Sequence, residues 1–110
     1  MKEKSAPPPK HLEPETRNWF AEIAASYELE SPHLRLLQLA AEAWDRCQEA
    51  RAQLAKDGIT FQDRFGNIRP HPAAGIERDA RTAFARLLRE LNLDLDEAPP
   101  EAPRPPPLKY

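Results

Sequence analysis

One long stretch of the sequence contains no helix breaker, and it constrains the fold more than any other feature. It begins at Ser31-Pro32, where a hydroxyl suited to an N-cap precedes a proline in the first turn. It ends at Gly58, which can take the positive φ of a helix terminus. The pattern therefore predicts a helix of about 26 residues, roughly twice the average length.

Apolar side chains cover an unusually wide part of this predicted helix. On a helical wheel they fill an arc of about 220°, whereas a helix that is buried on one side needs only a stripe of about 100°. A helix this broadly apolar must contact two neighbours, and we expect the second to be another copy of the chain. The residues expected at that interface are Leu36, Leu39, Ala43, Trp44, Cys47, Arg51 and Leu54.

Two residues of the arc need separate interpretation. Arg51 lies near its middle, where an unpaired charge would be unfavourable. Either its stem lies along the core while the guanidinium reaches water, or it pairs with a carboxylate across a subunit interface. Cys47 is interpreted as a buried, inert thiol, and as the single cysteine it excludes an intrachain disulfide and a multi-cysteine metal site.

A shorter helix precedes the long one. Pro14 suits a first helical position, because its missing N–H would be unpaired there. We predict a helix over about 14–27 from the spacing of its apolar residues. The residues on its apolar face are Trp19, Phe20, Ile23 and Tyr27.

The pattern changes period after Gly58. Ile59-Thr60-Phe61 and Ile68 flank Asp63-Arg64-Phe65-Gly66-Asn67, a link that contains glycine. We therefore predict a small β-hairpin in which Gly66 adopts a positive φ.

A third helix follows the hairpin. Pro70 and Pro72 end the hairpin and begin this helix, which fades by Asn92. His71 is interpreted as a residue of the helix start whose ring hydrogen-bonds locally. The apolar residues fall within about 140°, as in an ordinary amphipathic helix. They are Ala73, Ile76, Ala80, Ala83, Phe84, Leu87, Leu88 and Leu91.

The ends of the chain differ from its middle. Of 13 prolines in 110 residues, nine lie in Pro7–Pro9 and Pro99–Pro107. We expect a Pro-rich arm over 1–11, a helical domain over 12–95 and a Pro-rich tail over 96–110, with both ends disordered. The expected fold is mainly α, with three helices and a small β-hairpin between the second and third. A domain of this size is marginally stable alone, which favours assembly.

The tail contains two overlapping P-x-x-P spacings, Pro100 to Pro103 and Pro103 to Pro106. Such a segment is extended and low in conformational entropy, so it serves as a spacer or as a peptide that another protein binds. We expect Pro103, Pro106 and Leu108 to dock on a partner.

The sequence lacks the motifs of an enzyme or a membrane protein. It has no Gly-rich phosphate loop, no G-x-S-x-G motif and no His pair at helical spacing. We expect no catalytic residue, metal, cofactor or small-molecule substrate. No apolar run is long enough to span a membrane, and the first residues do not resemble a signal peptide. The expected location is the host-cell cytoplasm.

Charge is unevenly distributed, although the net charge is only −2. Residues 13–30 carry five acids and one arginine, a balance of −4, whereas residues 69–89 carry five arginines and two acids, a balance of +3. Arginines on an exposed helix face and on the adjacent hairpin could neutralise DNA phosphates. These candidates are Arg64, Arg69, Arg78, Arg81, Arg86 and Arg89.

Two other interpretations of these arginines stay open. They could be ordinary solvated charges, with Glu77–Arg81 and Arg86–Glu90 as i,i+4 pairs. Alternatively, the acidic first helix of one subunit could meet the basic third helix of the next, in a head-to-tail contact that closes into a ring.

Taken in order, these segments resemble the small subunit of bacteriophage terminase, in the short family of tailed phages and prophages. The resemblance covers nearly the whole chain, and its most specific part runs from Asp63 to Ala80. The segments that carry it are Pro8-Pro9-Lys10-His11-Leu12, Trp19 with Ile23, Leu36 to Arg46, Asp57-Gly58-Ile59-Thr60, Asp63-Arg64-Phe65-Gly66-Asn67, His71-Pro72, Ile76-Glu77-Arg78-Asp79-Ala80, Phe84, Leu87 and Leu88.

The resemblance implies a non-enzymatic DNA-packaging protein. It implies a homo-oligomeric ring that engages double-stranded viral DNA and regulates the large terminase subunit, the ATPase and nuclease. Many small subunits outside this short family carry an N-terminal helix-turn-helix, whereas the first helix here is acidic and the second is too long for a recognition helix. The alternative is a protein-interaction adaptor that does not bind nucleic acid.

Overall fold

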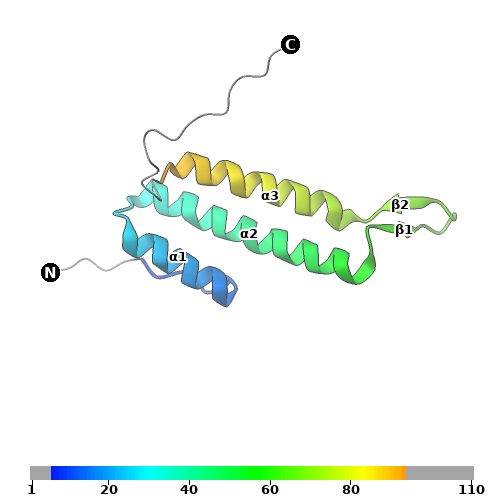
Figure 1. Ribbon diagram of the computed structural model, residues 1–110, viewed down its shortest axis with the longest axis horizontal. Helices are drawn as coiled ribbons and strands as arrows, with labels where there is room; N and C mark the ends of the chain where they lie inside the picture. Colours follow the sequence, from blue (N-terminus) through cyan, green and yellow to red (C-terminus); the bar gives the residue numbers. More distant parts are fainter. Residues whose placement is uncertain (1–5, 94–110) are drawn as a thin grey trace, which may run out of the picture.

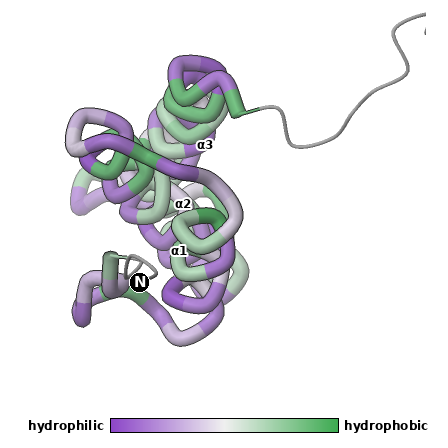
Figure 2. The backbone as a smooth tube through the Cα atoms, turned by 90° about the vertical axis from the view of Figure 1, so that its left-hand side faces the viewer, coloured by the Kyte–Doolittle hydropathy of each residue, from purple (hydrophilic) through white to green (hydrophobic). Residues whose placement is uncertain are grey.

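The long helix lies between two shorter ones in a computed structural model, which describes residues 6–93. The elements are α1 (Pro14–Ser26), α2 (Ser31–Asp57), β1 (Thr60–Gln62), β2 (Ile68–Pro70) and α3 (Pro72–Leu91). Figure 1 shows α1 beside the first half of α2, α3 along its length, and the hairpin projecting beyond the helices. The end-on view in Figure 2 also places α2 between α1 and α3. The predicted mainly α fold is confirmed.

Some predictions lie outside the described residues. These are the first five residues of the predicted arm over 1–11, the whole of the predicted tail over 96–110, and within it the proposed docking residues Pro103, Pro106 and Leu108. Within residues 6–93, no helix is long and apolar enough to cross a membrane.

The start of α2 differs by one residue from the prediction. Ser31 is the first helical residue and not the N-cap, a position that Glu30 occupies with an extended backbone and no side-chain capping bond. The Glu30 carbonyl accepts the first helical hydrogen bond from Leu34 N at 3.0 Å. Pro32 is tolerated in the first turn because N–H groups there have no helical partner. At the other end Gly58 takes the predicted positive φ, +88°, and its N–H donates to the Leu54 carbonyl at 2.7 Å.

The hairpin is held by one carboxylate at its turn. The Asp63 carboxylate accepts hydrogen bonds from the backbone N–H groups of Phe65 and Asn67, each at 2.9 Å, and from Arg69 Nε at 3.0 Å. Gly66 adopts the predicted positive φ, +84°. The strands pair in antiparallel register with Phe61 opposite Arg69.

His71 ties the base of the hairpin to both long helices. Its Nδ1 accepts a hydrogen bond from Ala73 N at 2.9 Å, which caps α3. Its Nε2 lies 2.9 Å from an oxygen of Asp57 at the end of α2. Because Nδ1 accepts a bond, the neutral ring carries its proton on Nε2 and donates to Asp57. The predicted local hydrogen bonding of His71 is confirmed.

The core is divided into a three-helix part and a two-helix part. Where α1, α2 and the end of α3 meet, the buried cluster comprises Leu12, Phe20, Ile23, Leu37, Ala41 and Leu91. Beyond α1, α2 and α3 pair alone, and small side chains allow their axes to lie close together. The buried residues there are Cys47, Ala50, Ala73 and Ala80.

The wide apolar arc of α2 is therefore covered partly by its own chain. In the three-helix part both neighbours, α1 and α3, are intramolecular, so this part does not require a second copy. Among the expected interface residues, Cys47 is buried, whereas Leu36, Ala43 and Leu54 are half-buried. Leu39 and Trp44 are 51% and 42% exposed.

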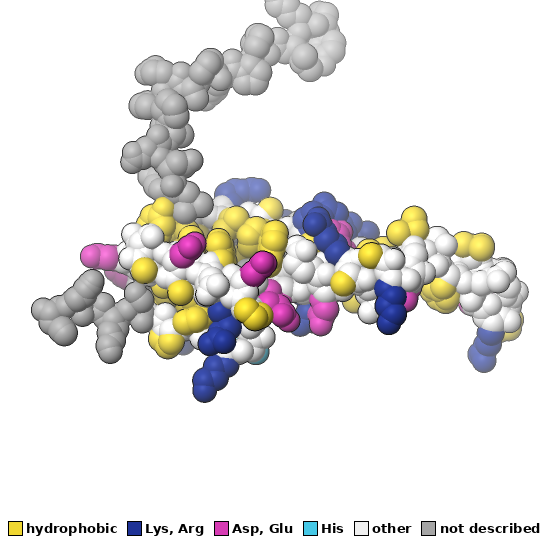
Figure 3. All heavy atoms as spheres, turned by 60° about the horizontal axis from the view of Figure 1, so that its bottom comes forward, with side chains coloured by type: hydrophobic (Ala, Val, Ile, Leu, Met, Phe, Trp, Pro, Cys, Tyr) yellow, Lys and Arg dark blue, Asp and Glu magenta, His cyan; other side chains and the backbone are white. Residues whose placement is uncertain are grey.

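The largest uncovered apolar side chains lie at the hairpin. Ile59 and Ile68 are each 69% exposed, Phe65 is 75% exposed and Phe61 is 44% exposed. Figure 3 shows hydrophobic side chains on the surface at the right-hand end, over the hairpin.

Two leucines of α2 provide a matched test of this arrangement. We expect Leu37→Ala to lower the free energy of unfolding by about 2–5 kcal/mol, because Leu37 is fully buried between the helices. Leu39→Ala removes the same atoms from a half-exposed site and should cost less than about 1 kcal/mol. Urea denaturation of dilute protein measures both, and equal losses would contradict the described core.

Candidate nucleic-acid interface

Four of the six candidate arginines share the outward side of α3. Arg78, Arg81, Arg86 and Arg89 are all exposed. On a helical wheel they span a sector of about 140°, and 11 residues separate the first from the last, or ~16 Å along the axis. No acidic residue falls in that sector. Its other residues are Ala74, Gly75, Thr82 and Ala85.

These four arginines differ in how far they are already paired. Arg81 is bound by Glu77, the predicted i,i+4 pair, with two nitrogen–oxygen distances of 3.2 Å. Arg78 meets Asp79 at 3.4 Å, but both side chains are more than 60% exposed, so the pair contributes little. Arg86 and Arg89 have no carboxylate partner within residues 6–93, and the predicted Arg86–Glu90 pair is not formed there.

The two hairpin arginines lie apart from this face. Arg69 is paired with Asp63 at 3.0 Å. The Arg64 guanidinium lies 5.3 Å from the centre of the Phe65 ring, in a cation–π arrangement at the hairpin tip. The structure thus places four of the candidate residues on one face and leaves Arg64 and Arg69 beyond the start of α3.

Glu77 joins α3 to α2 behind the arginine face. Its carboxylate accepts from Arg51 Nε at 3.2 Å and from Arg81, and the Cys47 thiol lies 3.6 Å away. Only 14% of the Glu77 side chain is exposed. The hydrogen bond from Arg81, followed by that from Arg51, lowers the pKa of Glu77 to about 2.

The same cluster accounts for Arg51 and Cys47. Arg51 pairs with a carboxylate of its own chain, an arrangement that neither of the two sequence-based alternatives described. The predicted burial of Cys47 is confirmed. Burial, together with the adjacent Glu77, raises the pKa of the Cys47 thiol, so the group stays protonated and can donate to the carboxylate.

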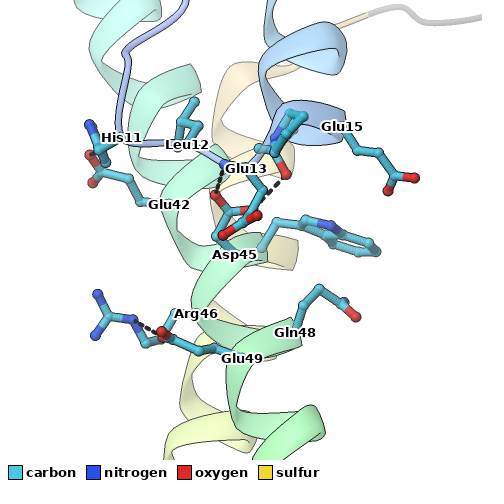
Figure 4. Close-up of a pocket in the computed structure, with 12 residues that line it drawn as sticks. His11, Leu12, Glu13, Glu15, Glu42, Asp45, Arg46, Gln48 and Glu49 are labelled. Atoms are coloured by element: carbon cyan, nitrogen blue, oxygen red, sulfur yellow. Dashed lines mark hydrogen bonds and ion pairs between the residues drawn. The ribbon is translucent and has the colours of Figure 1, made fainter.

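An acidic cavity of about 610 Å³ lies on the other side of the molecule, between the start of α1 and the middle of α2. Figure 4 shows Asp45 at its centre, bonded to the segment around Glu13. The Asp45 carboxylate accepts from Glu13 N at 2.9 Å and from the Thr16 hydroxyl. Glu42 lies 2.8 Å from the His11 ring and is bonded to Gln38, which lowers the pKa of Glu42.

An aromatic recess of about 260 Å³ adjoins this cavity. It is lined by Glu15, Thr16, Trp19, Trp44 and Phe84, so each of the three helices contributes to it. The Phe84 ring centre lies 5.2 Å from that of Trp44 and 6.0 Å from that of Trp19. Glu15, Thr16 and Trp44 line both the cavity and the recess.

Sequence reasoning missed three features of these sites. Glu77 was recognised only as the partner of Arg81, although its place at the edge of the apolar stripe of α3 signals a contact with α2. The contacts of Asp45 with Glu13 and Thr16 have no sequence signal, because no pattern reveals the angle at which α1 approaches α2. Phe84 was expected in the core, and its role in the recess depends on where the two tryptophans lie. Within residues 6–93, no group of three or more metal-binding side chains is placed to hold a metal ion.

The comparison with known families is decisive for identity. The profile of one family, described as "Phage terminase, small subunit", matches residues 17–97. The chain belongs to this family. The match covers most of α1 and all of α2, the hairpin and α3, and so the whole arginine face. Residues 11–16, which line part of the acidic cavity and of the aromatic recess, precede the match. No curated protein and no solved structure matches the chain. Membership of the terminase small-subunit family associates the chain with phage DNA packaging.

The Glu77 cluster predicts a specific pH dependence. The folded pKa of Glu77 lies below its ordinary value of 4.5, so the ionised carboxylate stabilises the fold above about pH 4.5. That contribution is lost as the pH falls towards 2. We expect Glu77→Gln to be less stable than the parent protein at pH 7, with a difference that shrinks towards pH 2.

Urea denaturation across this pH range measures the effect. The matched control is Asp79→Asn, which removes a carboxylate that is 78% exposed and should change stability little at any pH. A difference between Glu77→Gln and the parent that stays constant with pH would contradict the described cluster.

Proposed function

We propose that this terminase small subunit is a non-catalytic regulator of packaging that binds duplex DNA through the phosphate backbone. The observation that carries the proposal is the arginine face of α3: Arg78, Arg81, Arg86 and Arg89, on a sector without acids. A duplex presents about one phosphate charge per 1.7 Å, so a face ~16 Å long spans several phosphates.

The arginines of the α3 face differ in whether an acidic side chain already holds them. Arg81 is oriented by Glu77 and stays close to the helix, whereas Arg86 and Arg89 have no competing carboxylate among the described residues. Guanidinium groups suit phosphate oxygens, because their donors match the oxygens in pairs. Phosphate contacts carry no direct sequence information, so we expect weak sequence preference.

The remaining parts of the proposal concern assembly and partners. The chain forms a homo-oligomeric ring and regulates the large terminase subunit, which supplies the ATPase and nuclease. Its Pro-rich tail, with Pro103, Pro106 and Leu108, is the proposed docking peptide for that subunit. Support for non-catalytic action comes from the family, whose members are in general not enzymes.

A protein-only adaptor is the second candidate function. The exposed apolar side chains of the hairpin favour it, since they suit a protein partner as well as a neighbouring copy. The two functions differ in one respect: only the first requires the arginine face of α3, which would bind DNA.

Retention of the full chain on duplex DNA tests the proposal. We expect binding at 50 mM salt that weakens steeply by 200 mM, because phosphate binding releases counterions. The triple variant Arg78→Gln, Arg86→Gln and Arg89→Gln should lose most of this affinity, and its salt slope should fall by about three units. Arg81 is left in place because it is paired with Glu77, which also binds Arg51 of α2.

A second triple variant gives the matched control. Arg17→Gln, Arg35→Gln and Arg46→Gln change the net charge equally on exposed residues of α1 and α2. This variant should keep most of the DNA affinity. Equal loss in both triples would indicate a general charge effect, and no retention at low salt would favour the adaptor.

A further inference from the structure

The hairpin tip presents an aromatic ring and a cation together. Phe65 is 75% exposed, and the Arg64 guanidinium lies 5.3 Å from its centre. The turn beneath them is fixed by Asp63, so the two side chains project from a defined backbone. A two-stranded hairpin is marginally stable by itself in water, and Phe65 and Ile68 of this one are 75% and 69% exposed among the described residues. The tip therefore resembles one half of a protein–protein interface whose partner is absent.

The aromatic recess is concave and acidic where the tip is protruding and basic. Trp44 remains 42% exposed although it contacts Phe84, and the recess opens beside the acidic cavity. Glu15 lines both hollows and forms no ion pair with any residue among 6–93. An aromatic ring could enter the recess while its attached cation meets Glu15.

The tip and the recess of one chain cannot meet. Phe84 lies 12 residues into α3 from Pro72, or ~18 Å, and the strand from Pro70 to Phe65 adds ~17 Å in the same direction. Figure 1 shows the hairpin beyond the end of α2 that α1 does not reach. The occupant of the recess must therefore come from another molecule.

We propose that the hairpin tip of one copy docks in the aromatic recess of the next copy. Phe65 packs against Trp19, Trp44 and Phe84, and Arg64 pairs with Glu15. This inference rests on the oligomeric part of the proposed function and specifies which surfaces meet. The contact joins two different patches, so it repeats from copy to copy and closes into a ring when the rotation allows.

The proposed contact leaves the DNA-binding face uncovered. Phe84 lies about 120° or more around α3 from Arg78, Arg86 and Arg89, and about 60° from Arg81, which Glu77 already pairs. One side of α3 therefore serves assembly and the other remains open to phosphates. Leu39 is 51% exposed, and the sequence analysis expects it at a subunit interface, but it does not belong to the tip or to the recess.

Two complementary variants test the proposal by mixing. Phe65→Asp destroys the tip but keeps the recess, whereas Trp44→Ala destroys the recess but keeps the tip. Each alone should need about thirtyfold or more higher concentration to assemble than the parent, as on losing an aromatic hot spot. Mixed in equal amounts, they should form a 1:1 complex with one intact contact. Size-exclusion chromatography with light scattering measures the masses, and circular dichroism checks that each variant is folded.

A charge exchange keeps the test valid if Trp44→Ala fails to fold. Arg64→Glu should weaken assembly, and mixing it with Glu15→Arg should restore one contact per pair, because the exchanged charges then face each other. Recovery in either mixture supports the proposal. An absence of recovery in both, or a parent chain that stays monomeric at the highest concentration reached, would overturn it.

Leu39→Asp discriminates against an interface on the middle of α2. This variant should assemble like the parent chain. If Leu39→Asp fails to assemble while Phe65→Asp assembles normally, the docking proposal is overturned. DNA retention separates this failure from that of the proposed function. If the α3 arginine triple loses DNA while Phe65→Asp remains a multimer, only the docking proposal fails.

Discussion

The unequal lengths of the three helices determine the shape of the molecule and the surfaces that it exposes. α2 has 27 residues, or ~40 Å, and its apolar arc needs neighbours on two sides. α3 accompanies most of it, but α1 has only 13 residues and covers the first half. The second half of α2 is therefore packed on one side only, through small side chains and the Glu77 cluster. The hairpin projects beyond the helices, and its four large apolar side chains are 44–75% exposed.

Charged residues are also distributed differently on the two sides of the molecule. Glu77 is nearly buried, and it neutralises Arg51 and Arg81 where α2 and α3 lack a third helix. On the far side of α3, Arg86 and Arg89 have no carboxylate partner among the described residues, as suits a phosphate-binding face. The acidic cavity beside the aromatic recess lies on the α1 side. The basic face, the acidic cavity and the apolar tip are separate surfaces, as the proposed DNA binding and the proposed self-assembly both require.

Local sequence signals predict most of the fold, but they do not predict the contacts between its helices and strands. Pro14, Gly58 and Gly66 fix helix ends and a turn through their own backbone preferences, and the structure confirms them. The partner of Arg51 could not be predicted, because periodicity gives a direction around one helix and not the residue that faces it. For the same reason periodicity does not show which elements cover the wide arc of α2: it predicts two neighbours, and along the first half both are helices of the same chain, α1 and α3. The hydroxyl of Ser31 predicts an N-cap there, but Glu30 occupies that position through backbone geometry alone.

Hydrogen exchange of the unmodified chain at two concentrations tests most directly whether the uncovered end of the molecule is an assembly surface. In dilute solution the backbone amides of residues 59–70 should exchange rapidly, because a lone hairpin opens readily. At a concentration that favours assembly they should slow together with amides around Trp44, while amides buried between α2 and α3 change little. Exchange in the hairpin that is the same at both concentrations, in a chain shown to be assembled at the higher one, would contradict the account.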